Sequence, residues 1–177
     1  MLCTGGRCRA LDFRRVHEKS NDDRRGPVPA WGGLASAGDD IGHGRYLIRI
    51  AGCNDCHTAG FMQNAGQVAE ADWLTGDAMG WQGPWGTTYP GNLRLLAQQL
   101  DEDGWLVCAR QPMRPPMPSA SLQAMRDADL RAIYRYLRHL GAKGEPAPAY
   151  VPPGGPVATP YLDLTPKNLP QPPQAGR

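Results

Sequence analysis

The chain has 177 residues and a formal net charge of +2, with 19 Lys and Arg against 17 Asp and Glu. This length fits one domain, and the near balance of charge argues against a nucleic-acid-binding protein. The 22 glycines and 18 prolines indicate that part of the chain does not pack as regular structure. No apolar run in the sequence is long enough to span a membrane.

Residues 1–38 are predicted to form an irregular basic arm. Lys and Arg outnumber Asp and Glu between Met1 and Gly26, which accounts for the surplus positive charge of the chain. Acidic residues are interleaved with the basic ones, and no aromatic stacking pattern accompanies them. A solvated tail is therefore favoured over a nucleic-acid-binding segment.

Residues 39–144 are predicted to form the globular domain, which begins with a helix. Asp39 or Asp40 is the expected N-cap, and the helix is expected to run through Gly44 to Ile50. A domain of this length has a small side-chain core, which a large apolar cofactor would complete.

Directly after this helix comes Cys-Asn-Asp-Cys-His, in which Cys53, Cys56 and His57 have the spacing that attaches a c-type haem. Two thiols three positions apart can form thioethers with the two vinyl groups of one haem. The adjacent histidine then lies under the ring, where its imidazole can ligate the iron. The motif thus predicts one covalent haem c with His57 as an iron ligand.

Two other sites use paired cysteines. A zinc site needs four ligands, but no second Cys-x-x-Cys follows, and Cys3 and Cys8 have the wrong spacing. A thioredoxin-like dithiol would need a buried strand before it and a βαβ pattern around it, and neither is visible. Haem attachment is therefore favoured over both.

The rest of the domain is predicted to be helix and loop, so the fold class is all-α with about three main helices around the haem. Residues 55–88 show no period and are interpreted as a loop around the cofactor. Asp101 is expected to cap a second helix that ends at Gln111-Pro112. Asp127 is expected to cap a third helix that Gly141 terminates, with an apolar stripe of Leu130, Ile133, Tyr134, Leu137 and Leu140.

Met117 is the expected second axial ligand of the iron. A thioether is a weak ligand that the backbone must hold in place, and the prolines on both sides of Met117 stiffen its loop. Met113 is the competitor, and a role in filling the core is the alternative for Met117. Histidine ligation is disfavoured, because His17 is in the arm, His43 opens the first helix and His139 lies in the last helical turn.

The tail, residues 145–177, contains ten prolines and no periodicity, and we expect it to be extended. The sequence is consistent both with an ordered strap over the domain and with a free tail. Its apolar anchors are Tyr150, Tyr161, Leu162 and Leu164.

From Gly44 to Leu140 the chain resembles a mono-haem class I c-type cytochrome, especially the domains that serve membrane-bound dehydrogenases and oxidases. The resemblance is carried, in the family's order, by Gly44-Arg45-Tyr46, Cys53 to His57, Gly86 to Leu93, Met117-Pro118 and Leu130 to Leu137. Ser119 and Arg126 depart from the pattern, since an aromatic and a Ser/Thr cap are usual there.

The resemblance implies that the first and last helices cross at Gly44 and Tyr134, and that Met117 is the axial ligand. It also makes Trp85, Tyr89 and Asn92 candidates for hydrogen bonds to the haem propionates, although ordinary loop and packing roles have equal weight. The partners implied are redox proteins such as a dehydrogenase or a terminal oxidase.

The expected function is therefore one-electron transfer rather than enzymatic catalysis, because His57 and Met117 would fill both axial positions. A haem enzyme with an open distal site, acting on peroxide or on sulfur compounds with Cys108 as a thiolate, is the alternative. A gas or redox sensor is a third class, but no effector domain accompanies the motif.

The expected location is the periplasm, since haem attachment to this motif takes place across a membrane. However, the first 40 residues contain no apolar run of signal-peptide quality. A mis-chosen start codon, a lost signal or an altered export route would each explain this, and the first is favoured.

Overall fold

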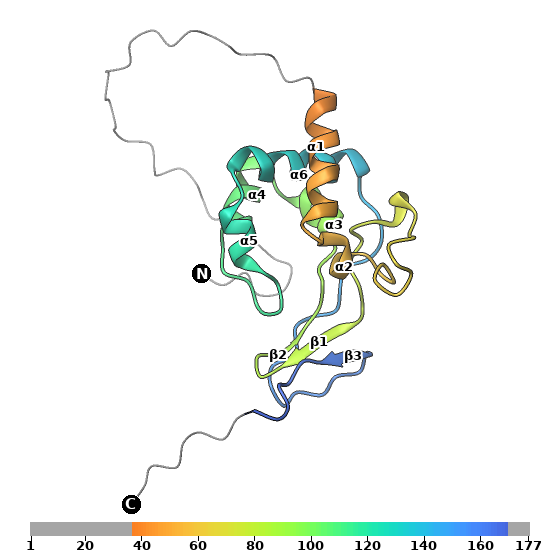
Figure 1. The fold of residues 1–177 in the computed structure, drawn as a ribbon, viewed down its shortest axis with the longest axis vertical. Coiled ribbons are helices and arrows are strands. Elements are labelled where there is room, and N and C mark those ends of the chain that lie inside the picture. The colour runs from red at the N-terminus through yellow and green to blue at the C-terminus, as the bar shows by residue number, and fades with distance from the viewer. Residues whose placement is uncertain (1–36, 170–177) are drawn as a thin grey trace, which may run out of the picture.

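The computed structural model describes residues 37–169, and the predictions for the arm lie almost wholly outside them. Helices dominate this part of the chain, and a small three-stranded sheet accompanies them (Figure 1). The helices are α1 (Ala37–Ile50), α2 (Cys53–His57), the 3₁₀ turn Glu70–Asp72, α3 (Leu93–Gln99), α4 (Glu102–Ala109), α5 (Ser119–Ala124) and α6 (Asp127–Leu140).

The crossing of α1 and α6 is the most extensive helix contact among the described elements. It depends on Gly44, where a β-carbon would overlap the carbonyl group of Ala132 and come too close to the β-carbon of Tyr136. The predicted crossing of the first and last helices at Gly44 is confirmed, but the partner on α6 is not Tyr134. Tyr134 instead packs against Trp105 of α4 and donates a 2.9 Å hydrogen bond to the carbonyl oxygen of Leu100.

The core is built on the apolar stripe of α6, as the sequence predicts. Leu130, Ile133, Tyr134 and Leu137 are buried, and Leu140 packs against them while partly exposed. The other elements add a ring of apolar side chains, among them Leu47, Ile48, Trp73, Leu74, Ala97 and Trp105.

The predicted helix ends are confirmed at two places and wrong at two. Asp101 caps α4 by accepting a 2.7 Å hydrogen bond from the amide of Gly104, and Gly141 ends α6 with a φ of 72°. Asp127, however, is the first residue of α6, and Arg126 holds the cap position. Asp39 and Asp40 lie inside α1, which begins at Ala37.

The helices α3 and α5 were not predicted, because each has fewer than eight residues. Asn92 caps α3, its side-chain oxygen accepting a 3.0 Å bond from the amide of Leu95. Buried Arg94 on α3 donates to the carbonyl oxygens of Ala71, Leu140 and Gly141, and so ties α3 to the end of α6.

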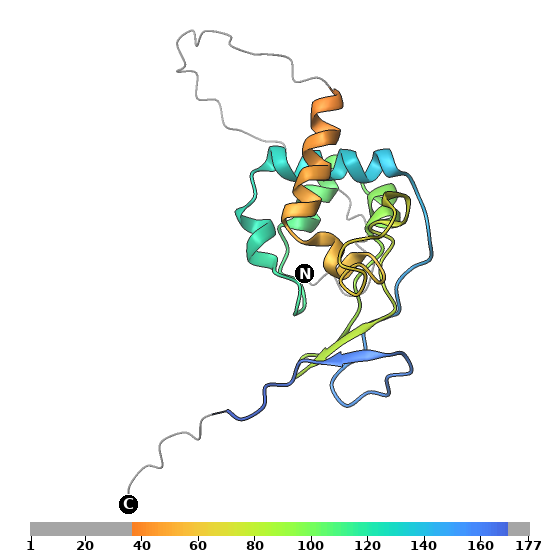
Figure 2. The ribbon, with the colours of Figure 1, turned by 45° about the vertical axis from the view of Figure 1, so that its right-hand side comes forward.

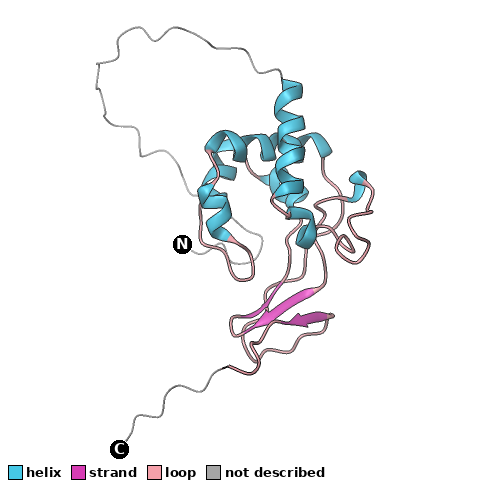
Figure 3. Cartoon of the chain, viewed as in Figure 1, coloured by secondary structure: helices cyan, strands magenta, loops and turns pink. Residues whose placement is uncertain are grey.

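The all-α prediction is wrong in part, because a three-stranded sheet lies apart from the helical body (Figure 3). Its order is β2 (Gly86–Thr88), β1 (Gly80–Gly83) and β3 (Tyr161–Asp163). The pair β1–β2 is antiparallel, whereas β1–β3 is parallel. Strands of three or four residues are too short for an alternating pattern to be visible in the sequence.

The described part of the C-terminal tail is an ordered strap, which resolves the alternative that the sequence leaves open. Residues 145–169 descend from α6 to the sheet (Figure 2). Val151 pairs with Thr87, and β3 supplies the third strand. Tyr161, Leu162 and Leu164 remain 46%, 41% and 37% exposed.

Within residues 37–169, no helix is both long enough and apolar enough to cross a membrane.

Candidate functional site

The helix α2 carries Cys53, Cys56 and His57 together, so the three residues that the motif predicts lie on one short element. Gly52 separates it from α1 with a φ of 67°, a left-handed conformation that favours glycine. The chain can therefore turn sharply between α1 and α2. This turn positions the motif at the end of the helix that packs on α6.

Two buried polar side chains fix the orientation of α2. The hydroxyl of Thr58 donates a 2.8 Å hydrogen bond to the side-chain oxygen of Asn54 and accepts one of 2.8 Å from the amide of Leu74. Both Asn54 and Thr58 are almost fully buried. Such a bonded pair in the interior holds α2 in one position, because breaking it would leave polar groups buried and unpaired.

The imidazole of His57 is held by one hydrogen bond of 2.7 Å between Nδ1 and the carbonyl oxygen of Gly91. A carbonyl only accepts, so Nδ1 carries the proton and the lone pair of Nε2 is left for another partner. Surrounding protein atoms desolvate the ring and lower the pKa of His57, although the Gly91 bond opposes this. His57 is therefore neutral near pH 7, which is the form that ligates a metal.

The thiols of Cys53 and Cys56 are partly exposed and are not activated as nucleophiles. Burial raises the pKa of Cys53 to about 11, and burial also raises the pKa of Cys56. Both residues are therefore thiols rather than thiolates at neutral pH. A redox dithiol needs the opposite shift.

Among the residues that the structure describes, no group of three or more His, Cys, Asp or Glu side chains is arranged to hold a metal ion. The motif residues would thus need a ligand from elsewhere to complete a tetrahedral zinc site. Cys3 and Cys8, the sequence's other candidates, lie outside the described residues.

Met117 lies on a different element, the loop of residues 110–118 between α4 and α5, which we call the ligand loop. In both ribbon views this loop and α2 project from the helical body on the side that faces the sheet (Figures 1 and 2). Met113 and Met117 are both partly buried. Axial ligation by Met117 therefore stays a prediction.

Of the three candidates for propionate contacts, only Trp85 retains an unpaired donor. Its indole Nε1 is buried without a hydrogen-bond partner in the described structure. Asn92 caps α3 and donates to the carbonyl oxygens of Lys143 and Glu145, while the hydroxyl of Tyr89 lies 2.7 Å from that of Thr159. A buried N–H without an acceptor indicates room for an acceptor that the protein does not supply.

These observations fit a haem at this site. Two thiols at the right spacing and a neutral imidazole with Nε2 available are the groups on α2 that a covalently attached haem needs. The unpaired indole N–H of Trp85 lies on the turn between β1 and β2. Asn54 Nδ2 is a second buried donor without a partner within residues 37–169, and we assign it no role.

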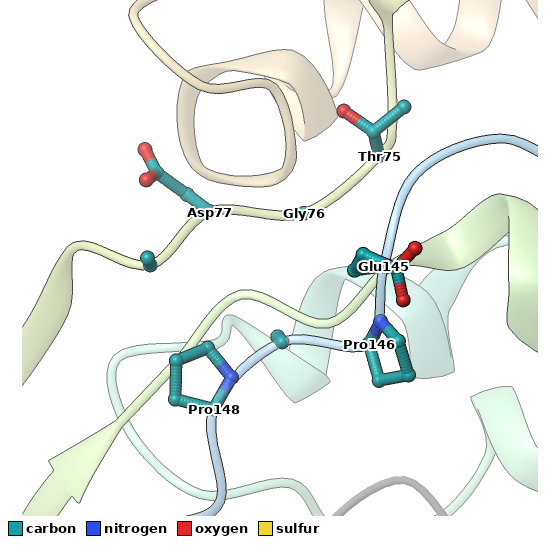
Figure 4. A pocket seen from close by; sticks show the side chains of 8 residues that line it. Thr75, Gly76, Asp77, Glu145, Pro146 and Pro148 are labelled. Carbon is teal, nitrogen blue, oxygen red and sulfur yellow. The ribbon is translucent and has the colours of Figure 1, made fainter.

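A small open pocket lies beside this site but offers none of its chemistry. One wall consists of Thr75, Gly76 and Asp77, and the other contains Glu145, Pro146 and Pro148 (Figure 4). The amide of Gly76 donates a 2.8 Å bond to the carbonyl oxygen of His57, so the pocket adjoins the last residue of α2. Its lining has no thiol and no imidazole, and we assign it no part in the candidate site.

Several residues that shape the site were not predicted. Thr58 and Gly91 act on the motif through hydrogen bonds, and Thr88 and Arg110 act on the ligand loop. Arg110 donates to the carbonyl oxygens of Leu122, Gln123 and Met125 and to the carboxylate of Asp127, which closes the loop at its base. No pattern in a single sequence marks such long-range partners.

Comparison of the chain with protein-family models, curated proteins and solved structures found no match. The resemblance to class I c-type cytochromes therefore depends on the motifs quoted above.

Proposed function

We propose that the protein is a one-electron carrier with one covalent haem c, ligated by His57 and Met117. When bound, the haem supplies an iron that cycles between the ferrous and ferric states. The observation that carries the proposal is that His57, which shares α2 with Cys53 and Cys56, donates a hydrogen bond from Nδ1 to the carbonyl oxygen of Gly91.

The chain's own residues have three tasks in this proposal. Cys53 and Cys56 anchor the cofactor, and His57 presents a neutral Nε2 that Gly91 keeps in one orientation. The ligand loop presents Met117, and Trp85 offers its indole N–H to a propionate. A rigid, enclosed cofactor with both axial positions filled leaves no place for substrate, which favours electron transfer over catalysis.

The proposed setting is the periplasm, and the proposed partners are redox proteins such as a dehydrogenase or a terminal oxidase. Both statements follow from the haem motif and the resemblance. Cys108, the thiolate suggested for the haem-enzyme alternative, is buried on α4 at 8% exposure, which argues against that alternative. Burial at such a position is typical of a small core residue.

Absorption spectra of the oxidised and reduced protein test the proposal. We expect a low-spin six-coordinate haem in both states and no change on addition of carbon monoxide to the reduced form. A high-spin spectrum, or ready carbon monoxide binding, would replace the carrier by an enzyme with an open distal site.

A further inference from the structure

We propose that the C-terminal strap, residues 145–169, positions the ligand loop, and that Tyr150 is its main point of action. The inference goes beyond the proposed function but rests on it where it concerns the iron, because the ligand loop carries Met117. Two independent sets of contacts connect the strap to the loop.

The first set is direct and centres on Tyr150. The guanidinium carbon of Arg114, in the ligand loop, lies 3.9 Å from the centre of the Tyr150 ring. The hydroxyl of Tyr150 donates a 2.7 Å hydrogen bond to the carbonyl oxygen of Trp85. Both Tyr150 and Arg114 are partly buried, which strengthens a cation–π contact relative to a fully exposed one. Tyr150 thus connects the ligand loop to the turn between β1 and β2.

The second set runs through β2. Thr87 and Val151 exchange two backbone hydrogen bonds of 2.8 and 3.0 Å, and Thr87 is almost fully buried. The approach is so close that a β-carbon at Gly86 would overlap the carbonyl oxygen of Val151. The next residue, Thr88, donates a 2.8 Å bond from its hydroxyl to the carbonyl oxygen of Pro115. The strap therefore supports β2, and β2 holds the ligand loop.

Both sets end at Arg114 and Pro115, which are three and two residues before Met117. The amide of Met117 donates a 3.2 Å bond to the carbonyl oxygen of Arg114, and the amide of Ser119 donates one of 2.9 Å to that of Met117. The amide of Met113 donates a 2.9 Å bond to the hydroxyl of Ser119. In a short turn stiffened by proline, fixing Arg114 and Pro115 also fixes the backbone of Met117.

A weak ligand depends on such positioning. A thioether has no charge to hold it at an iron, so small displacements of its backbone would favour dissociation. The strap thus acts as a brace that keeps the sixth coordination position closed. Loosening the brace should open that position without any change in the ligand itself.

The experiment compares four variants of the full chain with the native protein. Tyr150→Leu removes the ring contact and the hydroxyl bond, Tyr150→Phe removes only the hydroxyl bond, and Arg114→Gln removes the cation from the loop side. Tyr161→Leu is the matched control, because Tyr161 lies on β3 of the same strap with its side chain 46% exposed.

Hydrogen exchange of the amides of Met113, Arg114, Met117 and Ser119 is the first readout, and it does not depend on the iron. We expect exchange to be about tenfold faster in Tyr150→Leu, and to rise less in Tyr150→Phe, since a partly buried cation–π contact and one hydrogen bond are lost together. Arg114→Gln should also speed the exchange, by a smaller factor than Tyr150→Leu. The double variant should exchange little faster than Tyr150→Leu alone, because both substitutions remove the same contact. Tyr161→Leu should leave the exchange unchanged.

The second readout is the near-infrared absorption of methionine-ligated ferric haem, together with carbon monoxide binding to the ferrous protein. Tyr150→Leu should weaken the absorption and bind carbon monoxide faster than the native protein does.

If Tyr150→Leu and Arg114→Gln exchange at the rates of the native protein, the strap does not position the ligand loop, whether or not haem is bound. If the variants exchange faster but the native protein carries no haem, the role of the strap is kept and the proposed function is rejected. Faster exchange with an unaltered near-infrared absorption would overturn the link to the iron. Should Tyr150→Leu fail to fold, Tyr150→Phe and Arg114→Gln decide the question.

Discussion

Gly44 on α1 and Ala132 on α6 lie so close that a β-carbon at Gly44 would overlap the Ala132 carbonyl group. We predict that Gly44→Ala lowers the free energy of unfolding by about 1–3 kcal/mol, because the two helices must separate. Denaturant unfolding measures this.

Gly42 provides the control for that prediction. It lies on the same helix, and a β-carbon there would meet no atom within 4 Å. Gly42→Ala should be neutral or stabilise the protein by up to about 1 kcal/mol, since alanine favours helix over glycine. Equal destabilisation by both substitutions would contradict the close crossing at Gly44.

Asp129 connects α1 and α6 through charged hydrogen bonds. Its carboxylate accepts bonds of 2.9 and 3.0 Å from Arg126 and lies 2.8 Å from His43 Nε2. The Arg126 bonds, followed by the His43 bond, lower the pKa of Asp129 from its ordinary value of 3.8 to about 2. A lowered pKa in the folded state stabilises the protein above the unfolded value, and this stabilisation is lost as the pH falls from about 4 to about 2.

We therefore predict that Asp129→Asn destabilises the protein at pH 7 and flattens the acid limb of its stability curve. Unfolding measured between pH 7 and pH 2 checks both effects. An acid limb identical in native protein and variant would show that Asp129 does not contribute.

Arg94 is the most heavily bonded buried cation of the described core, donating to carbonyl oxygens from Ala71, Leu140 and Gly141. Arg94→Met should lower the free energy of unfolding by ~1–3 kcal/mol, because these carbonyls lose a charged donor. Arg49→Met, on the exposed face of α1, should change it by less than about 0.5 kcal/mol. Thermal unfolding of the pair measures the contrast, and equal effects would argue against the Arg94 bonds.

Met117 and Met113 are the two candidates for the second axial ligand of the iron, and substitution of each one distinguishes them. Met117→Ala should lose the near-infrared absorption of methionine-ligated ferric haem, lower the reduction potential and admit carbon monoxide, because neutral sulfur stabilises ferrous over ferric iron. Met113→Ala should keep all three native properties. The reverse result would preserve the carrier function and transfer the ligand role to Met113.

The sequence predicted those elements that are determined by residues close to one another along the chain. The stripe of α6, the Asp101 cap and the Gly141 terminus depend on residues within a few positions of one another. The motif on α2 is equally local, since Cys53, Cys56 and His57 share one helical turn or little more.

What the sequence could not predict depends on contacts between distant segments. The strand β3 pairs with β1 about 80 residues earlier, and neither strand is long enough to show an alternating pattern. Tyr150 was identified only as an apolar anchor, because nothing in a proline-rich tail indicates a partner at Arg114. Likewise, Gly91 orients His57 through a backbone carbonyl, which leaves no mark on residue identity.

Covalent attachment of haem to Cys53 and Cys56 is the central claim, and the intact mass of the denatured protein tests it most directly. Protein isolated from cells competent in haem c maturation should carry the mass of one haem beyond the sequence mass, and the Cys53→Ser, Cys56→Ser double variant should lack it. Native protein at the bare sequence mass, or a double variant that retains the added mass, would contradict the account.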